Sequence, residues 1–231
     1  MMKKQYIIVG GSRGIGKATA QLLIEQGHQV HIIARNMPEW EGAFDFYNCD
    51  VLKDELPSIF GEIDGLVYCP GSINLKPFKG LKEKDFQADF DINVLGAVKV
   101  LQMYTKNLQA SEQASVVLFS TVAVQTGMAF HASVSAAKGA VEGLVRSLAA
   151  EWSPKIRVNG IAPSITKTEL AARLLRNEKQ LEAAEARHPL ARIGQASDAA
   201  ELAIFLLELK SSWITGQIIA LDGGMSSIRK L

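Results

Sequence analysis

The sequence lacks several features that would mark a specialised class of protein. It has only two cysteines, Cys49 and Cys69, whose spacing suits neither a disulfide framework nor a metal site, so both are expected to be small buried residues. The formal net charge is +1, which gives no field to attract nucleic acid. No apolar run approaches the ~20 residues that cross a bilayer, so we expect a cytoplasmic protein without a membrane partner.

What the chain does contain is an alternation of β-type and helical segments. Its 231 residues suffice for one sizeable core, and no linker or repeat interrupts them, so 1–231 is predicted to be a single domain. Such alternation predicts a parallel sheet with helices on both faces. Strands are expected at 5–10, 29–34, 44–51, 65–70, 115–120, 156–162 and 217–222, and helices at 16–27, 52–60, 82–107, 134–152 and 197–209.

The connection between the first strand and the first helix is rich in glycine, with GGSRGIG at 10–16. Gly10 suits a tight turn, Gly14 lets a pyrophosphate approach the backbone, and Gly16 allows the helix to pack closely on the strand. The start of the helix offers free N–H groups to phosphate. Because the loop follows a buried strand, it predicts a dinucleotide site formed by Gly10, Ser12, Arg13, Gly14, Ile15 and Gly16.

These motifs resemble the short-chain dehydrogenase/reductase family, and in particular its bacterial ketoacyl-reductase-like members. GGSRGIG is similar to the family fingerprint G-x-x-x-G-x-G, IAPSITKTEL at 161–170 to its P-G-x-x-x-T segment, and TGQIIALDGG at 215–224 to its closing strand. The resemblance covers the whole chain and implies a Rossmann-type, doubly wound sheet of seven parallel strands in the order 3-2-1-4-5-6-7. It implies further cofactor contacts from Asp50, Val51, Gly71, Lys138, Pro163 and Thr168, with Asn93 in a proton relay.

Charge at the end of the second strand bears on which nicotinamide cofactor binds. An acidic residue there would accept from the 2′-hydroxyl of the adenosine ribose and repel a 2′-phosphate. Ala34 and Arg35 stand at this end, and Arg13 of the glycine loop is expected to lie nearby. Two guanidinium groups suit a phosphate, so NADP(H) is predicted. The alternative is that both arginines are solvated surface charges.

The stretch HASVSAAKGA at 131–140 departs from the family pattern. The resemblance places a substrate-protonating tyrosine one helical turn before Lys138, where this chain has Val134. It places an oxygen-binding serine thirteen residues before that, where Thr121 keeps a hydroxyl and the adjacent Ser120 offers another. Valine donates no proton, so we expect the ordinary carbonyl reduction of the family to be impaired, because its general acid is missing.

His131 offers one compensation. It lies seven residues before Lys138, which is the spacing at which the enoyl-reductase branch of the superfamily carries its tyrosine. An imidazole with a pKa near neutrality could serve as the general acid. The alternative is that His131 is a loop residue at the entrance of the helix and takes no part in catalysis.

A second departure follows the fourth strand, where YCPG at 68–71 replaces the N-N-A-G of the family. Tyr68 and Cys69 cannot supply the amide hydrogen bonds of that motif, and Pro70 lacks a backbone donor. The change is expected to alter local rigidity rather than cofactor binding, because Gly71 still permits a close approach of the backbone.

Three functions stay open at this point. The first is an NADP(H)-dependent oxidoreductase for a carbonyl or activated alkene, such as an acyl thioester, with the proton supplied by His131, Thr121 or water. The second is a cofactor-binding pseudoenzyme, and the third is an inactivated variant of a ketoreductase. The segment 164–196 is predicted to be a substrate lid, because it carries helical stretches where a short link would suffice. In related proteins the helices expected at 82–107 and 134–152 form one two-fold interface and the C-terminal strand forms another, so a homotetramer is expected, with a dimer as the alternative.

Overall fold

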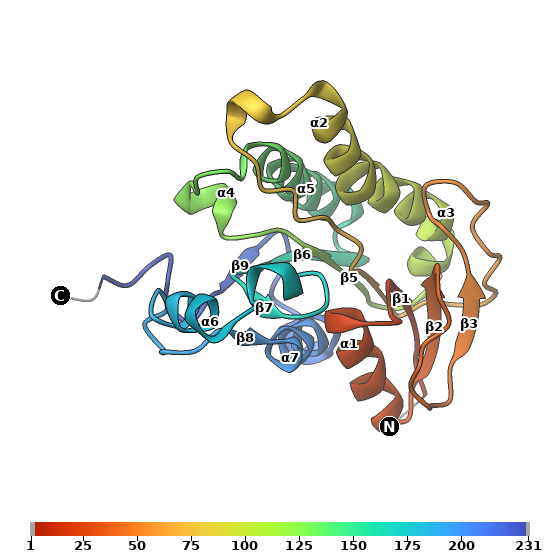
Figure 1. The fold of residues 1–231 in the computed structure, drawn as a ribbon. Coiled ribbons are helices and arrows are strands. Elements are labelled where there is room, and N and C mark those ends of the chain that lie inside the picture. Colours follow the sequence, from red (N-terminus) through yellow and green to blue (C-terminus); the bar gives the residue numbers. More distant parts are fainter. Residues whose placement is uncertain (1–2, 230–231) are drawn as a thin grey trace.

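A computed structural model describes residues 3–229, and its centre is a parallel sheet of seven strands (Figure 1). The strand order is β3-β2-β1-β4-β5-β6-β9, which confirms the predicted fold, with β9 as the last strand of the sheet. The strands are β1 (Gln5–Val9), β2 (Gln29–Ala34), β3 (Asp45–Asn48), β4 (Gly65–Tyr68), β5 (Ala114–Phe119), β6 (Ile156–Pro163) and β9 (Ile218–Leu221).

Helices cover both faces of the sheet (Figure 1). One layer consists of α1 (Gly14–Glu25) and α7 (Ala196–Leu207), and the other contains α2 (Glu83–Phe90), α3 (Gly96–Ala110) and α5 (Ala132–Trp152). Alternate residues of β1 divide between the two layers. Ile7 belongs to the core beneath α3 and α5, whereas Tyr6 and Ile8 belong to the core beneath α1 and α7. A strand buried on both faces needs apolar residues at every position, which is why it could be recognised in the sequence.

The helix expected at 52–60 is absent from the described structure, where these residues form a turn followed by an extended segment. The N–H of Leu52 donates to Oδ1 of Asp50 at 3.1 Å, and the N–H of Asp50 donates to Oδ2 of Asp54 at 2.7 Å. Aspartate side chains that bond nearby backbone amides in this way compete with helix formation. Pro57 also disfavours the helical conformation of the residue before it.

The helix predicted at 82–107 forms, but a change of pitch divides it. Between α2 and α3, residues Asp91–Leu95 form a π-helical turn that carries Asn93. A π-turn shifts the hydrogen bonding of the helix by one residue, and such turns are frequent at functional sites. The apolar spacing of the sequence does not reveal this shift, because the residues on either side keep their helical periodicity.

The segment 164–196 leaves the sheet at the carboxyl end of β6 and returns at α7. Its two short strands, β7 (Thr166–Lys167) and β8 (Gly194–Gln195), pair with each other and close a loop that contains α6 (Glu178–Glu185) (Figure 1). The excursion therefore begins at the same edge of the sheet as the glycine loop. Within residues 3–229, none of the helices has the length and apolar character needed to cross a bilayer.

Candidate active site

The glycine loop after β1 is fixed by backbone contacts. Gly10 has φ +79° and Gly14 has φ +53°, a region that strongly favours glycine. A Cβ on Gly16 would collide with the carbonyl oxygen of Gly10, so the start of α1 packs against the loop with no room for a side chain. Arg13 is the N-cap of α1, and within residues 3–229 no side chain caps this helix. Its first amides are therefore available to an anion.

The segment after β6 folds back onto this loop. A Cβ built on Gly14 would lie 3.3 Å from Cγ2 of Thr168 and 3.6 Å from Oε2 of Glu169. Pro163 ends β6, and its carbonyl accepts from the N–H of Val122 at 3.3 Å, which joins the segment to the residues after β5. The predicted cofactor contacts Gly14, Pro163 and Thr168 are thus brought to one edge of the sheet.

Ser12 and Ile15 complete the predicted loop, and both are half-buried. Ile15 packs against the core beneath α1 and α7, so its side chain faces the protein rather than the edge of the sheet. The carbonyl of Ile15 accepts from the hydroxyl of Thr19 at 2.9 Å. Of these two residues, only the polar Ser12 can offer a side-chain hydrogen bond to a ligand.

The ends of β2 and β3 form a second part of the edge. Asn48 pairs with Ala34 in the parallel ladder, and its Nδ2 donates to the carbonyl of Arg35 at 2.8 Å. Nη2 of Arg13 lies 2.8 Å from the side-chain amide of Asn36 and donates to its oxygen when the amide is turned to face it. The glycine loop and the end of β2 therefore bring Arg13 and Arg35, both of which are exposed, to the same region.

Asp50 and Val51 follow β3 at this edge. Val51 is buried, whereas Asp50 is half-buried and uses Oδ1 to accept from Leu52. The N–H of Cys49 donates to the carbonyl of Ala34 at 3.0 Å, which extends the β2–β3 pairing up to these residues. These two predicted cofactor contacts therefore stand beside the end of β2.

Lys138 is the cation at the centre of the molecule. Its side chain projects from α5, the residue is only 8% exposed, and Nζ donates to the carbonyl of Phe119 at 2.7 Å. Desolvation lowers the pKa of Lys138 to about 8, although the nearby Cys69 and Asp89 act in the opposite direction. A lysine in this state can change its charge near neutral pH, which an exposed lysine does not do.

Asn93 lies close to Lys138 across the loop that follows β4. A Cβ on Gly71 would be 3.1 Å from Oδ1 of Asn93 and 3.4 Å from Nζ of Lys138, so only glycine leaves this space open. Nδ2 of Asn93 donates to the carbonyl of Asp89 at 2.7 Å and to Oγ of Ser72 at 3.0 Å. The three predicted residues Gly71, Asn93 and Lys138 are therefore neighbours.

Tyr68 replaces the amide bonds that the YCPG sequence cannot make. Its hydroxyl donates to the carbonyl of Ile92 at 2.7 Å, and this carbonyl belongs to the π-turn. A Cβ on Gly96 would collide with the same hydroxyl, so Gly96 makes room for it. Burial raises the pKa of Tyr68, which keeps it neutral. Tyr68 thus connects β4 to the turn that positions Asn93. The YCPG sequence at 68–71 therefore replaces one set of structural hydrogen bonds with another.

Ser72 and Asp89 join the site although the sequence motifs did not indicate them. The hydroxyl of Ser72 donates to Oδ1 of Asp89 at 2.6 Å, and Asp89 is 2% exposed. Oδ2 of Asp89 and Oδ1 of Asn93 are buried and accept no hydrogen bond from any described residue. The sequence offered one hint, since Asp89 is an acidic residue one helical turn before the predicted relay residue Asn93.

A buried valine and two hydroxyl groups occupy the region of the expected proton donor. Val134 lies one turn before Lys138 on α5 and is 5% exposed. Thr121 follows β5, and its Oγ1 accepts from the N–H of Ala123 at 3.3 Å, which leaves its own proton available. Ser120 instead donates to Oε1 of Glu142 at 2.8 Å. Thr121 is therefore the better placed of the two hydroxyls to bind a substrate oxygen.

His131 is the N-cap residue of α5 and is half-buried. Its Nδ1 lies 2.8 Å from the carbonyl of Ala129, so this nitrogen carries the proton and donates to that oxygen. The neighbouring Phe130 has φ +69°, an uncommon conformation for a bulky residue, and its side chain is exposed. His131 thus belongs to a constrained loop at the entrance of the helix, and its role in catalysis stays a prediction.

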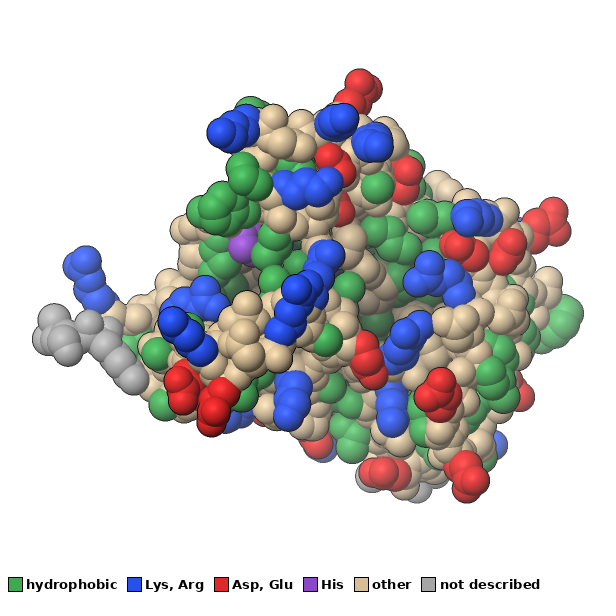
Figure 2. All heavy atoms as spheres, viewed as in Figure 1, with side chains coloured by type: hydrophobic (Ala, Val, Ile, Leu, Met, Phe, Trp, Pro, Cys, Tyr) green, Lys and Arg blue, Asp and Glu red, His purple; other side chains and the backbone are tan. Residues whose placement is uncertain are grey.

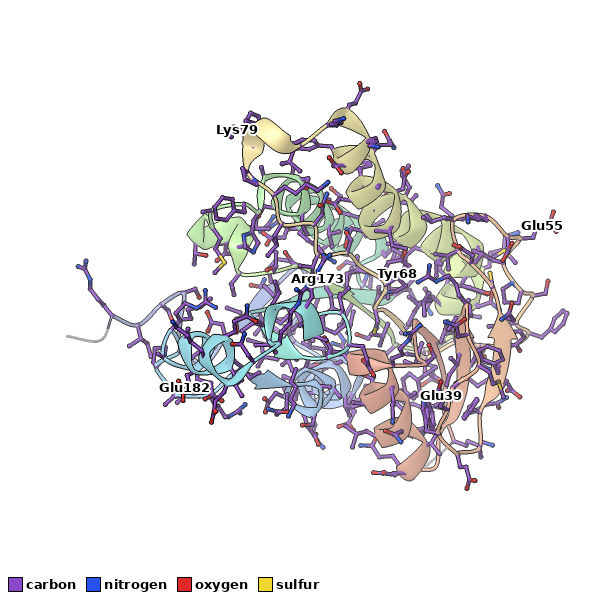
Figure 3. All side chains as sticks on the ribbon, in the orientation of Figure 1. Glu39, Glu55, Tyr68, Lys79, Arg173 and Glu182 are labelled. Atoms are coloured by element: carbon purple, nitrogen blue, oxygen red, sulfur yellow. The ribbon has the colours of Figure 1, made fainter. Side chains whose placement is uncertain are left out.

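The surface of the molecule is hollowed between the side that carries α2 and α5 and the side that carries α6 and α7 (Figure 2). Lys and Arg side chains lie on both sides of this hollow. Figure 3 shows Arg173 on the segment before α6, with its side chain extending toward the side of the molecule that carries β4, whose last residue, Tyr68, is labelled. The positive charge of the excursion is thus directed toward the site.

Comparison with known proteins agrees with this geometry. The family model described as "Enoyl-(Acyl carrier protein) reductase" matches residues 9–226. A tropinone reductase homologue of Arabidopsis thaliana is 34% identical, with 95% of this chain and 92% of the relative aligned. The 3-oxoacyl-[acyl-carrier-protein] reductase of Bos taurus is 31% identical, with 97% of this chain and 98% of the relative aligned.

A solved structure of ElxO with NADP bound superposes with a TM-score of 0.87 at 27% identity, and the alignment covers 98% of this chain and 100% of that one. A tyrosine-to-phenylalanine variant of ElxO with NADPH bound gives the same TM-score of 0.87 at 28% identity. The family match spans nearly the whole chain, and the strand order and glycine loop agree with it. The chain therefore belongs to the short-chain dehydrogenase/reductase family of oxidoreductases.

Proposed function

We propose that this protein is an NADP(H)-dependent oxidoreductase that acts on a carbonyl compound or an activated alkene. The observation that carries the proposal is the cradle formed by Gly10, Gly14 and Gly16, which a single Cβ would fill, at the uncapped start of α1. Such a cradle fits a pyrophosphate, and a nicotinamide cofactor supplies or accepts a hydride when it is bound. Lys138 stands near the same edge of the sheet to hold ribose hydroxyls.

Two arginines favour the phosphorylated cofactor. Arg13 reaches the amide of Asn36, next to Arg35, so a 2′-phosphate at the end of β2 would meet two guanidinium groups. Ala34 ends β2 without the carboxylate that would repel this phosphate. The related ElxO has NADP bound in its solved structure, which agrees with the assignment.

The substrate side of the proposal rests on Thr121 and on the positive charge around the hollow. Thr121 can donate its hydroxyl to a carbonyl oxygen and polarise it. Arg173 extends toward the site from the segment that we propose as a lid (Figure 3). An acyl thioester whose carrier bears phosphate fits this charge, and acyl-carrier-protein substrates appear in the names of the family model and of the bovine relative.

A second function, a cofactor-binding pseudoenzyme, is favoured by one observation. Val134 is buried one turn before Lys138 and has no proton to give, although the rest of the site is assembled. The ElxO variant that lacks a tyrosine hydroxyl is described with NADPH bound, so that relative still binds its cofactor without this hydroxyl. The two functions make the same prediction for binding and opposite predictions for turnover.

The experiment is a fluorescence titration of the protein with NADPH and NADH, followed by a turnover assay on 3-oxoacyl and 2-enoyl thioesters. NADPH should bind more tightly, and Arg35→Ala should weaken NADPH alone by about ten- to a hundredfold, since a charge-assisted phosphate contact is worth roughly 1.5–3 kcal/mol. Arg229→Ala, an exposed arginine near the carboxyl end of the chain, is the matched control.

Equal weakening of NADPH and NADH by Arg35→Ala would show that Arg35 does not contact the 2′-phosphate. Tight NADPH binding with no oxidation of NADPH by any thioester or ketone in the panel would contradict the oxidoreductase and support the pseudoenzyme. Absence of binding to both cofactors would contradict both functions.

A further inference from the structure

The reaction of this family moves a proton as well as a hydride, and Val134 cannot provide the proton. A group that replaces it must reach the substrate side of the site and must connect to a second group that can hold the proton. The cluster of Ser72, Asp89 and Asn93 meets both requirements within the described residues.

The three side chains are joined by short hydrogen bonds. Ser72 Oγ donates to Asp89 Oδ1 at 2.6 Å and accepts from Asn93 Nδ2 at 3.0 Å, so both interactions of the hydroxyl are directed. Asn93 Nδ2 is also held by the carbonyl of Asp89 at 2.7 Å. The orientation of the Ser72 hydroxyl toward the carboxylate is therefore fixed by its neighbours, as a base requires of the group that it activates.

Asp89 is buried, and burying a carboxylate costs free energy unless hydrogen bonds or an opposite charge compensate for the lost water. It is 2% exposed, its Oδ2 has no donor among the described residues, and its one side-chain donor is Ser72. The charged group that interacts with it is Lys138, whose pKa the charge of Asp89 raises, and Cys69 interacts with the same lysine. Asp89 and Lys138 are thus opposite charges in one buried site.

Ser72 is the member of the cluster that reaches outward. It is half-buried, whereas Asp89 and Asn93 are fully buried. It directly follows Gly71, whose missing Cβ would lie 3.4 Å from Lys138 Nζ. Since consecutive Cα atoms are about 3.8 Å apart, Ser72 lies within one residue of the space beside the lysine. Asp89 also lies on α2, which packs against α5, the helix that carries Val134 and Lys138.

We propose that the hydroxyl of Ser72 exchanges the proton with the substrate oxygen, and that Asp89 holds Ser72 in place and takes up its proton. This inference rests on the proposed oxidoreductase function. When an alcohol is oxidised, its carbon loses a hydride to the cofactor, and its hydroxyl proton passes to Ser72 Oγ as the original Oγ proton moves to Asp89 Oδ1. In reduction the same transfers run backward, and Asp89 regains its proton from solvent.

Ser72→Ala and Asp89→Asn test this assignment in the full-length protein. Each should lower kcat by about a hundredfold or more while KM and NADPH affinity stay within about threefold, because proton transfer is typically worth 10²–10⁴-fold. The double variant should be no slower than either single variant, since the two residues act as one unit. Ser72→Thr, which keeps the hydroxyl, should retain most of the activity, and Glu83→Gln, on the exposed start of α2, is the control.

Rescue by a carboxylate and the titration of Lys138 distinguish this role from a purely structural one. Asp89→Glu, which keeps the carboxylate, should restore part of the kcat that Asp89→Asn loses. In the cofactor-free protein, Asp89→Asn should lower the pKa of Lys138 below about 8, because it removes a charge that favours the ammonium, whereas Ser72→Ala should not. Chemical labelling of Lys138 against pH, read by mass spectrometry, measures this.

Turnover that survives both substitutions within twofold would overturn the assignment of Ser72 and Asp89 and leave the oxidoreductase function standing. Losses that add in the double variant, or that appear in KM and NADPH affinity instead of kcat, would also overturn it and assign the pair to loop structure. A wild-type protein that binds NADPH but turns over no substrate overturns the proposed function and this assignment together.

Discussion

The carboxyl edge of β1, β2 and β3 and the carboxyl edge of β4 and β5 are held in different ways. At the first edge, backbone atoms decide the geometry, as shown by Gly16, where a Cβ would collide with the carbonyl of Gly10. At the second edge, side chains such as Ser72, Asp89 and Tyr68 make the decisive contacts. A side chain can be replaced without altering the fold, whereas the backbone path of a tight loop cannot.

This difference explains how the chain can keep a cofactor cradle while its reaction centre changes. The departures lie at the second edge, in YCPG at 68–71 and at Val134, and the structure compensates for one of them. Tyr68 bonds the π-turn in place of the amide contacts, and Gly96 leaves space for its ring hydroxyl. Chemistry can therefore change at the second edge at little cost to folding, and the comparison predicts large effects on rate there and large effects on binding at the first edge.

The largest effect should come from Val134→Tyr. A phenol one turn before Lys138 would supply the proton that Val134 cannot, so carbonyl reduction should rise by about 10²–10⁴-fold in the Ser72→Ala background and by less in the wild type, where Ser72 already serves. The Ser72→Ala background is the sharper test, because it lacks the proposed donor. The measurement is kcat/KM for NADPH-dependent reduction of ketones and 3-oxoacyl thioesters.

Val134→Phe is the matched control, because it adds the ring without its hydroxyl. Val134 is buried, and extra volume in a packed site costs about 1–3 kcal/mol, so thermal stability and NADPH affinity must be measured for both variants. If Val134→Tyr folds, binds NADPH and is no faster than Val134→Phe, the second edge lacks more than a proton donor, and the comparison of the two edges fails.

The next effect concerns the first edge, through Gly16→Ala. The added methyl group would meet the carbonyl of Gly10, so α1 must move away from the loop, and NADPH affinity should fall by about ten- to a hundredfold with a loss of roughly 1–3 kcal/mol in stability. Gly143→Ala in α5 is the control, because its Cβ would meet open space, and it should be neutral or stabilising by about 0.5–1 kcal/mol. Fluorescence titration and thermal unfolding measure the two quantities. Unchanged NADPH affinity in Gly16→Ala would mean that the backbone does not fix the cradle.

The same difference separates what the sequence could predict from what it could not. The strand order and the glycine loop were predictable, because buried parallel strands are continuous apolar runs and because a loop without side chains needs glycine. The expected helix at 52–60 was wrong, because side chains of Asp50 and Asp54 bond nearby amides and Pro57 follows them. Local hydrogen bonds of this kind leave little trace in apolar periodicity.

The candidate site was predicted in part. Gly71, Asn93 and Lys138 are neighbours, as the motifs implied, since each lies at a fixed place on the fold. Asp89 and Ser72 were missed, because their partnership depends on a contact between a helix and a loop that are distant in the sequence. The π-turn adds to this difficulty, since it changes which helical residues face the loop after β4.

The smallest of these effects should appear in the stability of Lys138→Met. In the folded protein the pKa of Lys138 falls from 10.5 to about 8, so at pH 7 the buried ammonium destabilises the fold, by roughly 3 kcal/mol at 1.36 kcal/mol per pKa unit. Methionine removes this cost but also removes the bond to the carbonyl of Phe119, which offsets about 1 kcal/mol. Lys138→Met should thus be more stable than wild type by about 1–3 kcal/mol at pH 7, while its turnover is lost.

The advantage of Lys138→Met should depend on pH in a defined sense. Below pH 8, wild-type Lys138 is charged in both the folded and the unfolded state, and the free-energy cost of burying the ammonium is fully present. Between pH 8 and 10.5, the unfolded chain binds a proton that the folded chain does not. Wild-type stability therefore rises with pH in this range relative to the variant. Urea unfolding at pH 7 and pH 9.5 measures the difference. A variant that is less stable than wild type at pH 7 would show that Lys138 supports the fold, and the second edge would then be as constrained by folding as the first.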